Sequence, residues 1–252
     1  MKHILILTIS LLFLQVTAQE NRQYDKYMHP NDSLLMVSLP ELKLPESYKG
    51  LKAKDLPDFH NNAENEFFRP IFDQYGWSCG QASTIGYNFT YEMNRFKNTS
   101  AQVEENQYAP GHTFNFFNLG ENGIGMCYLY TLDAIKWNGN PNVTDYGGMY
   151  WDLSHWANGY DIYYNGMFNK IDEIYSIHVG DEEGLLTLKQ YMYDHLDGSA
   201  TGGIANFYTD LYSFTSLPAG TPEEGKSVIT EFGPYTGHSM TFIGWNDSIR
   251  WD

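Results

Sequence analysis

The sequence predicts an α+β protein in which helices come first along the chain and short strands follow. Between residues 79 and 196, apolar side chains recur at intervals of three and four, which is the period of a helix with one buried face. From residue 203 onward, short apolar or alternating runs are separated by Gly, Pro and Asp, as is typical of strands and turns. This order favours α+β over an alternating α/β fold.

The first eighteen residues have the composition of a secretory signal peptide. Lys2 and His3 form a short basic start, residues 4–16 are apolar, and small residues end the segment at Ala18. The apolar run is too short for a membrane anchor, and no later segment is apolar enough to span a bilayer. We therefore expect cleavage after Ala18 and an exported protein that is secreted, periplasmic or held at the cell surface.

The remaining 234 residues (252 minus 18) are enough for one large domain. Residues 19–55 are polar with little periodicity and predict a loosely ordered lead-in. Residues 56–252 form the predicted domain, and residues 56–72 contain two Pro and predict an extended approach to it. The formal charge of −16 excludes a basic stripe for nucleic acid but identifies no partner.

The strongest predicted helix begins at Cys79. Ser78 precedes it and is a residue type that caps helices, while Gly80 and Gly86 weaken the helix, so burial must hold it together. The face expected to be buried consists of Ala82, Ile85, Phe89, Met93 and Phe96.

Further elements follow from the same reasoning. Helices are predicted over residues 128–137, 150–157 and 185–196, with Gly139 and Gly198 lying just beyond the first and the last. Residues 160–168 are rich in aromatic side chains and predict a loop or an edge. The expected strands cover residues 203–207, 227–232 and 239–245.

Cys79 and His238 are the residues that carry the functional prediction. A Cys at the start of a helix benefits from the exposed N–H groups and the positive end of the helix dipole, which stabilise a thiolate. His238 lies 159 residues further on, in a Gly-flanked strand, and such Cys–His couples meet only in the fold. The alternatives are that Cys79 is a small buried hydrophobe, or that it forms a bridge with Cys127, the only other cysteine and itself expected in the core.

The segment Gln74-Tyr-Gly-Trp-Ser-Cys79-Gly-Gln-Ala-Ser83 resembles the active-site segment of papain-like cysteine peptidases. Gly147-Gly148 is similar to the Gly pair that lines the substrate cleft of that family. The segment that begins at Gly237-His238 is similar to the strand that carries the family's catalytic His. The resemblance covers residues 56–252 and suggests a divergent bacterial branch.

This resemblance implies a two-lobed fold, with a helical lobe whose central helix starts at Cys79 and a β-rich lobe that carries His238. Cys79 would be the nucleophile, His238 its acid–base partner and Gln74 an oxyanion donor. The chain departs from the family pattern because the usual flanking disulfide cysteines are absent. The Asn that orients the family's His is also absent up to Asp252, so we expect it, and the end of the domain, beyond this residue.

The predicted function is therefore cysteine-type endopeptidase activity on peptide or protein substrates, without cofactor or metal. The histidines form no metal-binding signature, and neither a Gly-x-Ser-x-Gly elbow nor a phosphate-binding Gly loop occurs. Two alternatives stay open: a Cys–His amidase or transglutaminase-type acyl transferase, and a non-catalytic binding or surface protein. Substrate preference, propeptide removal and oligomeric state do not follow from the sequence.

Overall fold

A computed structural model describes residues 37–117, 127–149, 155–217, 219–220 and 224–249. The predicted signal peptide lies outside these residues. The described chain is a mixture of helices and small antiparallel sheets, so the α+β prediction is confirmed at the level of class. The helices are α3 (Cys79–Gln81), η4 (Ala82–Phe89), α4 (Thr90–Lys97), α5 (Pro110–Phe117), α6 (Tyr128–Asn138), α7 (Val143–Tyr146), α8 (Tyr160–Gly166) and α9 (Glu182–Asp194).

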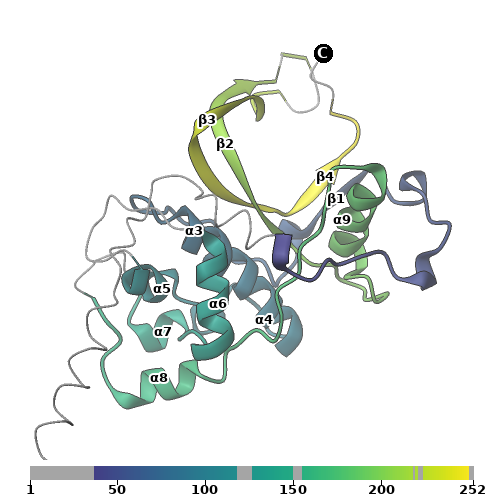
Figure 1. Ribbon diagram of the computed structural model, residues 1–252. Helices are drawn as coiled ribbons and strands as arrows, with labels where there is room; N and C mark the ends of the chain where they lie inside the picture. The colour runs from purple at the N-terminus through teal and green to yellow at the C-terminus, as the bar shows by residue number, and fades with distance from the viewer. Residues whose placement is uncertain (1–36, 118–126, 150–154, 218, 221–223, 250–252) are drawn as a thin grey trace, which may run out of the picture.

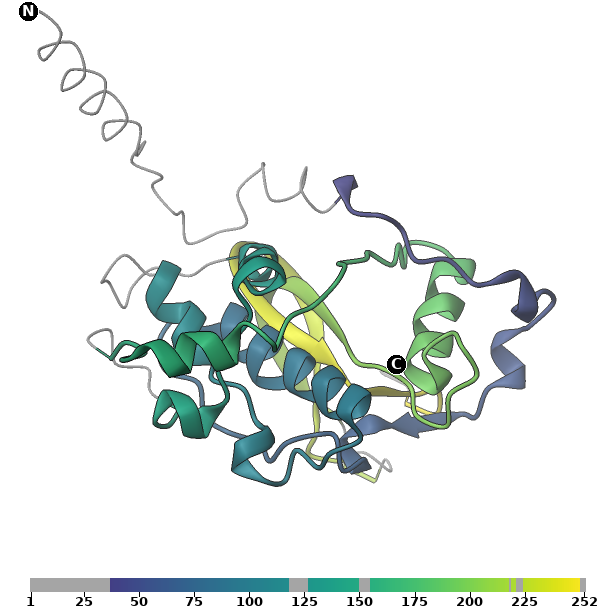
Figure 2. The same cartoon turned by 90° about the horizontal axis from the view of Figure 1, so that it is seen from below.

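Each of the two described sheets pairs two antiparallel strands. The strands are β1 (Phe59–Asn61), β2 (Ala205–Ser216), β3 (Ser227–Phe242) and β4 (Gly244–Asn246). β2 pairs with β3 as a long hairpin, and β4 continues from β3 to pair with β1. Helices α5, α7 and α8 lie on one side of the hairpin and α9 on the other (Figure 1 and Figure 2).

The helix that begins at Cys79 runs without a break through α3, η4 and α4. Its middle segment η4 is π-helical, a wider form that is rare over eight residues. The hydroxyls of Ser83 and Thr84 donate to the carbonyls of Cys79 and Gly80, four residues earlier. These side-chain bonds compete with the backbone N–H groups for the same carbonyls, which favours the wider turn.

The wide turns shift the buried face of this helix. Ile85 and Phe89 are fully buried as expected and pack in a core cluster with Met93. Phe96, however, is 82% exposed, so its predicted burial is wrong. A π-helical turn holds more residues than an α-turn, so the inward face of α4 rotates towards Tyr91.

Helix α6 agrees with the predicted helix over residues 128–137 and ends at Gly139, whose φ is +69°. Two other predictions need correction. Residues 160–168, expected to be a loop or edge, begin with the helix α8. The ring of Tyr160 stacks on that of Tyr164, which in turn meets the ring of Phe168, just beyond the helix, edge to face. In the predicted helix over residues 150–157, residues 150–154 lie outside the described part and residues 155–157 are not helical.

Helix α9 ends at Asp194, earlier than the predicted stop. His195 and Leu196 both have left-handed backbone conformations, with φ of +62° and +61°, and these terminate the helix. At the other end, the side chain of Asp181 accepts a hydrogen bond from the backbone N–H of Gly184 at 2.8 Å and caps the helix.

The strands are longer than the sequence predicts. The expected strands over residues 227–232 and 239–245 are mostly one strand, β3. In its register Phe232 lies opposite Leu211 and Gly237 lies opposite Asp210, so residues 233–236 have no opposing partner on β2. This bulge contains Pro234, which has no N–H to donate to a neighbouring strand.

The lead-in is attached to the molecule over its described part, although we expected loose order. The backbone N–H of Ser176 donates to the carbonyl of Pro40, and the N–H of Leu42 donates to the carbonyl of Ser176. Tyr48 donates to the carboxylate of Asp194 at 2.6 Å. The lead-in therefore runs beside the segment that precedes α9 and beside the end of that helix.

Candidate functional site

Cys79 is the first residue of the long helix and is half-buried. The turn before it depends on Gly76, whose φ of +57° lies in the left-handed region. Ser78 occupies the predicted cap position, but its hydroxyl donates to the carbonyl of Tyr75 at 2.8 Å and makes no cap to the helix. Ser78 therefore stabilises the approach to the helix instead of its first turn.

The β3 strand lies against this end of the helix. The backbone N–H of Ser239 faces the Cys79 thiol and acts to lower the pKa of that group. One turn further along the helix, the hydroxyl oxygens of Ser83 and Ser239 are 2.6 Å apart, and Thr241 donates to the carbonyl of Ser83 at 3.1 Å. The residue that follows His238 thus contacts the long helix one turn after Cys79.

The pKa of the Cys79 thiol is raised, and burial is the main cause. Hydrogen bonds from the backbone N–H groups of Ser239, Gly80 and Cys79 itself lower the pKa, as a helix N-terminus is expected to do, but burial outweighs them. The direction is opposite to the lowered value that we expected from the sequence. In this state the thiol is therefore the favoured form at neutral pH.

His238 is half-buried on β3, directly opposite Thr209 of β2. Burial lowers the pKa of its imidazole, so the neutral ring is favoured. Within the described residues, no hydrogen bond joins this ring to the Cys79 thiol. The fold brings the two backbone segments together, and in the described residues the Cys79 thiol and the His238 imidazole are both neutral and not hydrogen-bonded to each other.

Gln74 lies on the exposed approach to the helix. Its side-chain amide donates to the carbonyl of Gly76 at 3.4 Å. Gln74 and Cys79 are therefore linked through one short turn, and the amide is engaged within that turn. Its role as an oxyanion donor stays a prediction.

Gly147 and Gly148 end the short helix α7. Their φ values are +96° and +137°, and the N–H groups of both donate to the carbonyl of Val143. This left-handed turn explains why Gly occurs twice at these positions. Met149, the next residue, contacts the buried Arg69. The two glycines thus have a structural task at a helix end, and their role in substrate binding stays a prediction.

Two residues beside the site, Ser83 and Thr209, were not predicted from the sequence. Ser83 lies four residues after Cys79, and helical spacing alone places both on one face of the helix. Thr209 becomes a neighbour of His238 only through the strand register, for which the sequence offers no signal. Cys127 is buried beside Tyr128 and Leu129, as expected of a core residue, and neither cysteine forms a disulfide.

Within the described ranges, no group of three His, Cys, Asp or Glu side chains could hold a metal ion. No helix of the described chain combines the length and apolar character needed to cross a bilayer. Comparisons with protein-family models, with curated proteins and with solved structures found no match to this chain.

Proposed function

We propose that this protein is an exported, papain-like cysteine peptidase with the two-lobed fold of that family, in which Cys79 is the nucleophile and His238 its acid–base partner. One observation carries the proposal: the hydroxyl of Ser239, the residue after His238, lies 2.6 Å from the hydroxyl of Ser83, one turn after Cys79 on the long helix. The fold therefore joins two segments that lie about 160 residues apart in the sequence.

The reaction follows from the two side chains. The Cys79 thiol passes its proton to the His238 ring, and the sulfur forms a bond to the carbonyl carbon of the scissile peptide. His238 then gives the proton to the leaving amine as the C–N bond breaks, which leaves a thioester. Water, deprotonated by His238, attacks the thioester and releases the acid and the free thiol.

The neutral resting pair is compatible with this sequence of steps. Hydrogen bonds between catalytic groups are often long in a free enzyme and tighten when substrate binds. The backbone N–H of Cys79 and the side-chain amide of Gln74 are the proposed donors to the oxyanion, for which Gln74 must leave the Gly76 carbonyl. Gly147 and Gly148 are the proposed cleft residues.

Selective alkylation tests the proposal. We expect a limiting amount of iodoacetamide at neutral pH to modify Cys79 faster than a free thiol and to abolish cleavage of a peptide substrate. Cys79→Ala removes both effects, whereas Cys127→Ala, the matched control for the second thiol, keeps both. If His238→Ala is alkylated at Cys79 as fast as the wild type, the catalytic assignment is refuted.

A second candidate is a non-catalytic binding protein that keeps the fold. It is favoured by the raised pKa of Cys79 and by the missing bond between thiol and imidazole. In that case Cys79 reacts no faster than a free thiol at any pH. If Cys79 is reactive but peptides are not cleaved, incorporation of an amine into a glutamine-containing protein separates an acyl transferase from an amidase.

A further inference from the structure

Six aromatic side chains are exposed on α8 and on the two segments beside it. Helix α8 lies at the edge of the helical part of the molecule, on the side away from the hairpin (Figure 1). Each of the six is between 41% and 75% exposed. We call this set the α8 patch, and its members are Phe116, Trp156, Tyr160, Tyr163, Tyr164 and Phe168. Large exposed apolar side chains gathered on one face mark an interaction site.

Three rings of the α8 patch follow one another along the helix. The ring centres of Tyr160 and Tyr164 are 5.6 Å apart, and those of Tyr164 and Phe168 are 5.1 Å apart. Residues four apart lie on the same side of a helix, so this row runs parallel to the axis of α8. The row is held in place by its own ring contacts and presents a preformed apolar ridge.

The buried ring of His112 connects this ridge to the rest of the α8 patch. Its centre lies 5.9 Å from that of Tyr163 on α8 and 5.0 Å from that of Phe116 on α5. Phe116 in turn meets the ring of Trp156 at 5.4 Å. Burial lowers the pKa of His112 to about 4, so the ring beneath the patch is uncharged at neutral pH. The six side chains therefore form one continuous, uncharged aromatic surface.

The size of the α8 patch matches one side of a stable protein interface. A large aromatic side chain covers about 150–250 Å², so the exposed fractions give the patch roughly 500–800 Å². Stable interfaces bury about 600–1,000 Å² on each partner. Tyr, Trp and Phe are enriched at the centres of such interfaces, and charged residues are depleted there.

The charges at the two ends of the α8 patch complement a second copy of the same patch. Asp161 lies in the first turn of α8, and Lys170 lies just beyond its last turn. Both are exposed, and neither forms an ion pair within the part of the chain that the structure describes. When two copies of α8 run antiparallel about a twofold axis, Asp161 of each copy faces Lys170 of the other.

We propose that the protein forms a twofold-symmetric dimer, in which the α8 patch packs against the α8 patch of a second copy with the two helices antiparallel. The formal charge of −16 disfavours an anionic membrane or nucleic acid as the occupant of this surface. The same charge repels two copies at most orientations, whereas the α8 patch offers an uncharged centre with opposite charges at its ends. This inference is independent of the proposed peptidase function.

Sedimentation velocity of the purified protein over a range of concentrations tests the aromatic contact. We expect a dimer at micromolar concentration, and we expect Phe168→Ser to raise its Kd about tenfold or more, as for a central aromatic contact. The matched control is Phe96→Ser, which removes a ring that is 82% exposed but lies on α4, outside the α8 patch. Because both rings are exposed, both variants should keep the melting temperature of the wild type.

Charge reversal tests the antiparallel arrangement. Asp161→Lys places two cations opposite each other, and Lys170→Asp places two anions opposite each other. By symmetry each change acts twice in the dimer, so each should raise the Kd about tenfold. The double variant recreates both ion pairs with their signs exchanged and should restore dimerisation.

Three results would overturn the inference. The first is a wild-type protein that stays monomeric at all concentrations, including one whose α8 patch binds a different macromolecule. The second is a dimer that Phe168→Ser weakens no more than Phe96→Ser does. The third is a dimer that the single charge reversals leave unchanged, or that the double variant does not restore.

Discussion

Arg69 shows at the scale of a single residue how this fold tolerates a buried cation. Its side chain is 4% exposed, and its Nε and Nη1 atoms have no hydrogen-bond partner among the residues that the structure describes. Its remaining contacts are weak: the guanidinium lies 4.4 Å from the centre of the Phe72 ring and 3.4 Å from the Met149 sulfur. Burial lowers the pKa of Arg69 to about 10. Burying this charge therefore destabilises the fold, whereas packing of the side chain against Phe72 stabilises it.

The substitution Arg69→Met separates the charge from the stem. Methionine keeps an apolar chain against Phe72 and removes the unpaired nitrogens, so we expect the free energy of unfolding to stay equal or rise by up to about 2 kcal/mol. Arg69→Ala loses the packing too and should lower it by about 1–3 kcal/mol. Urea unfolding of both variants measures these changes.

The matched control is Arg95→Met, in which the arginine is paired with Glu92 at 3.1 Å. Removing Arg95 takes one of the two cations away from the partly buried Glu92 carboxylate, which keeps only His195 and Tyr191, so this variant should be less stable than the wild type. A strong loss of stability in Arg69→Met as well would mean that the attraction between Arg69 and Glu104 outweighs the cost of burying the charge.

At the scale of the element, the long helix is shaped by a close contact at Gly86. A Cβ atom at this position would lie within 2.8 Å of the Phe72 Cε1 atom and closer still to Cζ. The Phe72 ring is in turn stacked on Tyr87 at 4.9 Å. The glycine that weakens the helix in sequence is thus the residue that lets the approach segment pack on its wide π-helical turns.

We expect Gly86→Ala to lower the free energy of unfolding by about 1–3 kcal/mol, because the added methyl group displaces the Phe72 ring. In a Phe72→Leu background the ring is absent, and the same change should raise it by about 0.5–1 kcal/mol through helix propensity. The double-mutant cycle measures the coupling by urea unfolding. Equal effects of Gly86→Ala in both backgrounds would contradict the proposed contact.

The long helix also shows how far sequence patterns reach. The spacing of Ile85 and Phe89 predicts one buried face, which the structure confirms. It does not predict the π-helical turns, since these depend on hydroxyl bonds inside the helix and on the fit of Phe72 over Gly86. For this reason Phe96, which the spacing predicts on the buried face, is exposed in the structure. Apolar periodicity reports burial, whereas the local pitch of a helix depends on tertiary contacts.

In the candidate site, too, the sequence predicts the elements but not the tertiary contacts between them. Cys79 at a helix start and His238 on a strand are both predicted correctly as elements. Their neighbours depend on which residues of β2 and β3 face each other, and that register is fixed only by the folded hairpin. Thr209, buried opposite His238, is therefore visible in the structure alone.

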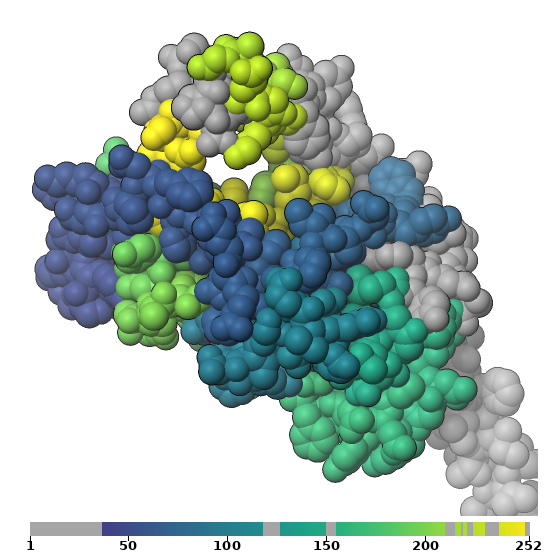
Figure 3. Space-filling view, turned by 180° about the vertical axis from the view of Figure 1, so that it is seen from behind, coloured from purple at the N-terminus to yellow at the C-terminus, as the bar shows by residue number. Residues whose placement is uncertain are grey.

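At the scale of the whole molecule, the β-strands are attached to two helical regions, the hairpin to the long helix and β4 to α9. Ser83 of the long helix contacts Ser239 of β3. Helix α9 lies on the other side of the hairpin (Figure 1). Lys189 of α9 also forms an ion pair with Asp247, just after β4, at 2.5 Å. The outer part of the hairpin stands apart from the body, with an opening beneath it (Figure 3).

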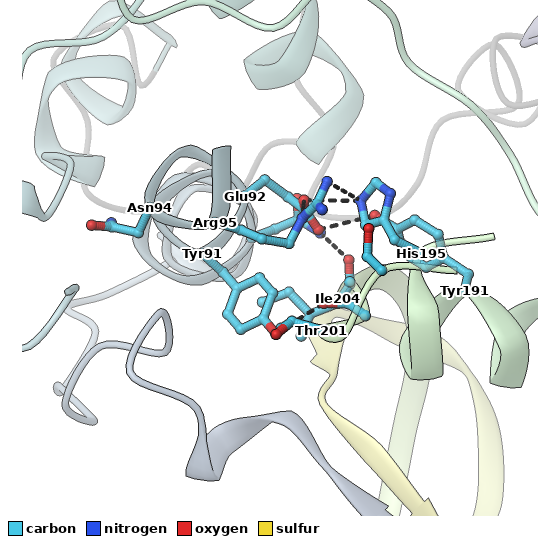
Figure 4. A network of polar contacts seen from close by, with 12 residues as sticks. Tyr91, Glu92, Asn94, Arg95, Tyr191, His195, Thr201 and Ile204 are labelled. Carbon is cyan, nitrogen blue, oxygen red and sulfur yellow. Dashed lines mark hydrogen bonds and ion pairs between the residues drawn. The ribbon is translucent and has the colours of Figure 1, made fainter. Parts of the chain in front are cut away.

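A network of polar side chains joins α4 directly to the end of α9 (Figure 4). The carboxylate of Glu92 accepts from Arg95 at 3.1 Å and from Tyr191 at 3.0 Å, and lies 3.1 Å from the His195 ring. Each of these side chains is at least partly buried, so water competes little with the bonds. The network is thus the principal polar contact between the two helices among the described residues.

The charge on Glu92 makes this contact sensitive to acid. Burial by itself would raise the pKa of Glu92, but the hydrogen bonds and positive charges of His195 and Arg95 outweigh it, so the pKa is lowered. A carboxyl group whose pKa is lower in the folded state stabilises the fold fully above its unfolded pKa of about 4.3. That contribution is lost as the pH falls from there through the lowered folded value.

Glu92→Gln tests whether this network contributes to the stability of the whole molecule. At pH 7 we expect the variant to unfold about 1–3 kcal/mol more easily than the wild type, because a neutral amide replaces a paired carboxylate. The difference should shrink as the pH falls below about 4.3, since protonated Glu92 and Gln are then both neutral. All other acidic groups are common to both proteins, so their titration cancels in the comparison. Urea unfolding of the two proteins at pH 7, 5, 4 and 3 gives the difference directly. A difference that stays constant over this range would show that the loss comes from altered packing of the side chain, and that the charge of Glu92 does not hold α4 and α9 together.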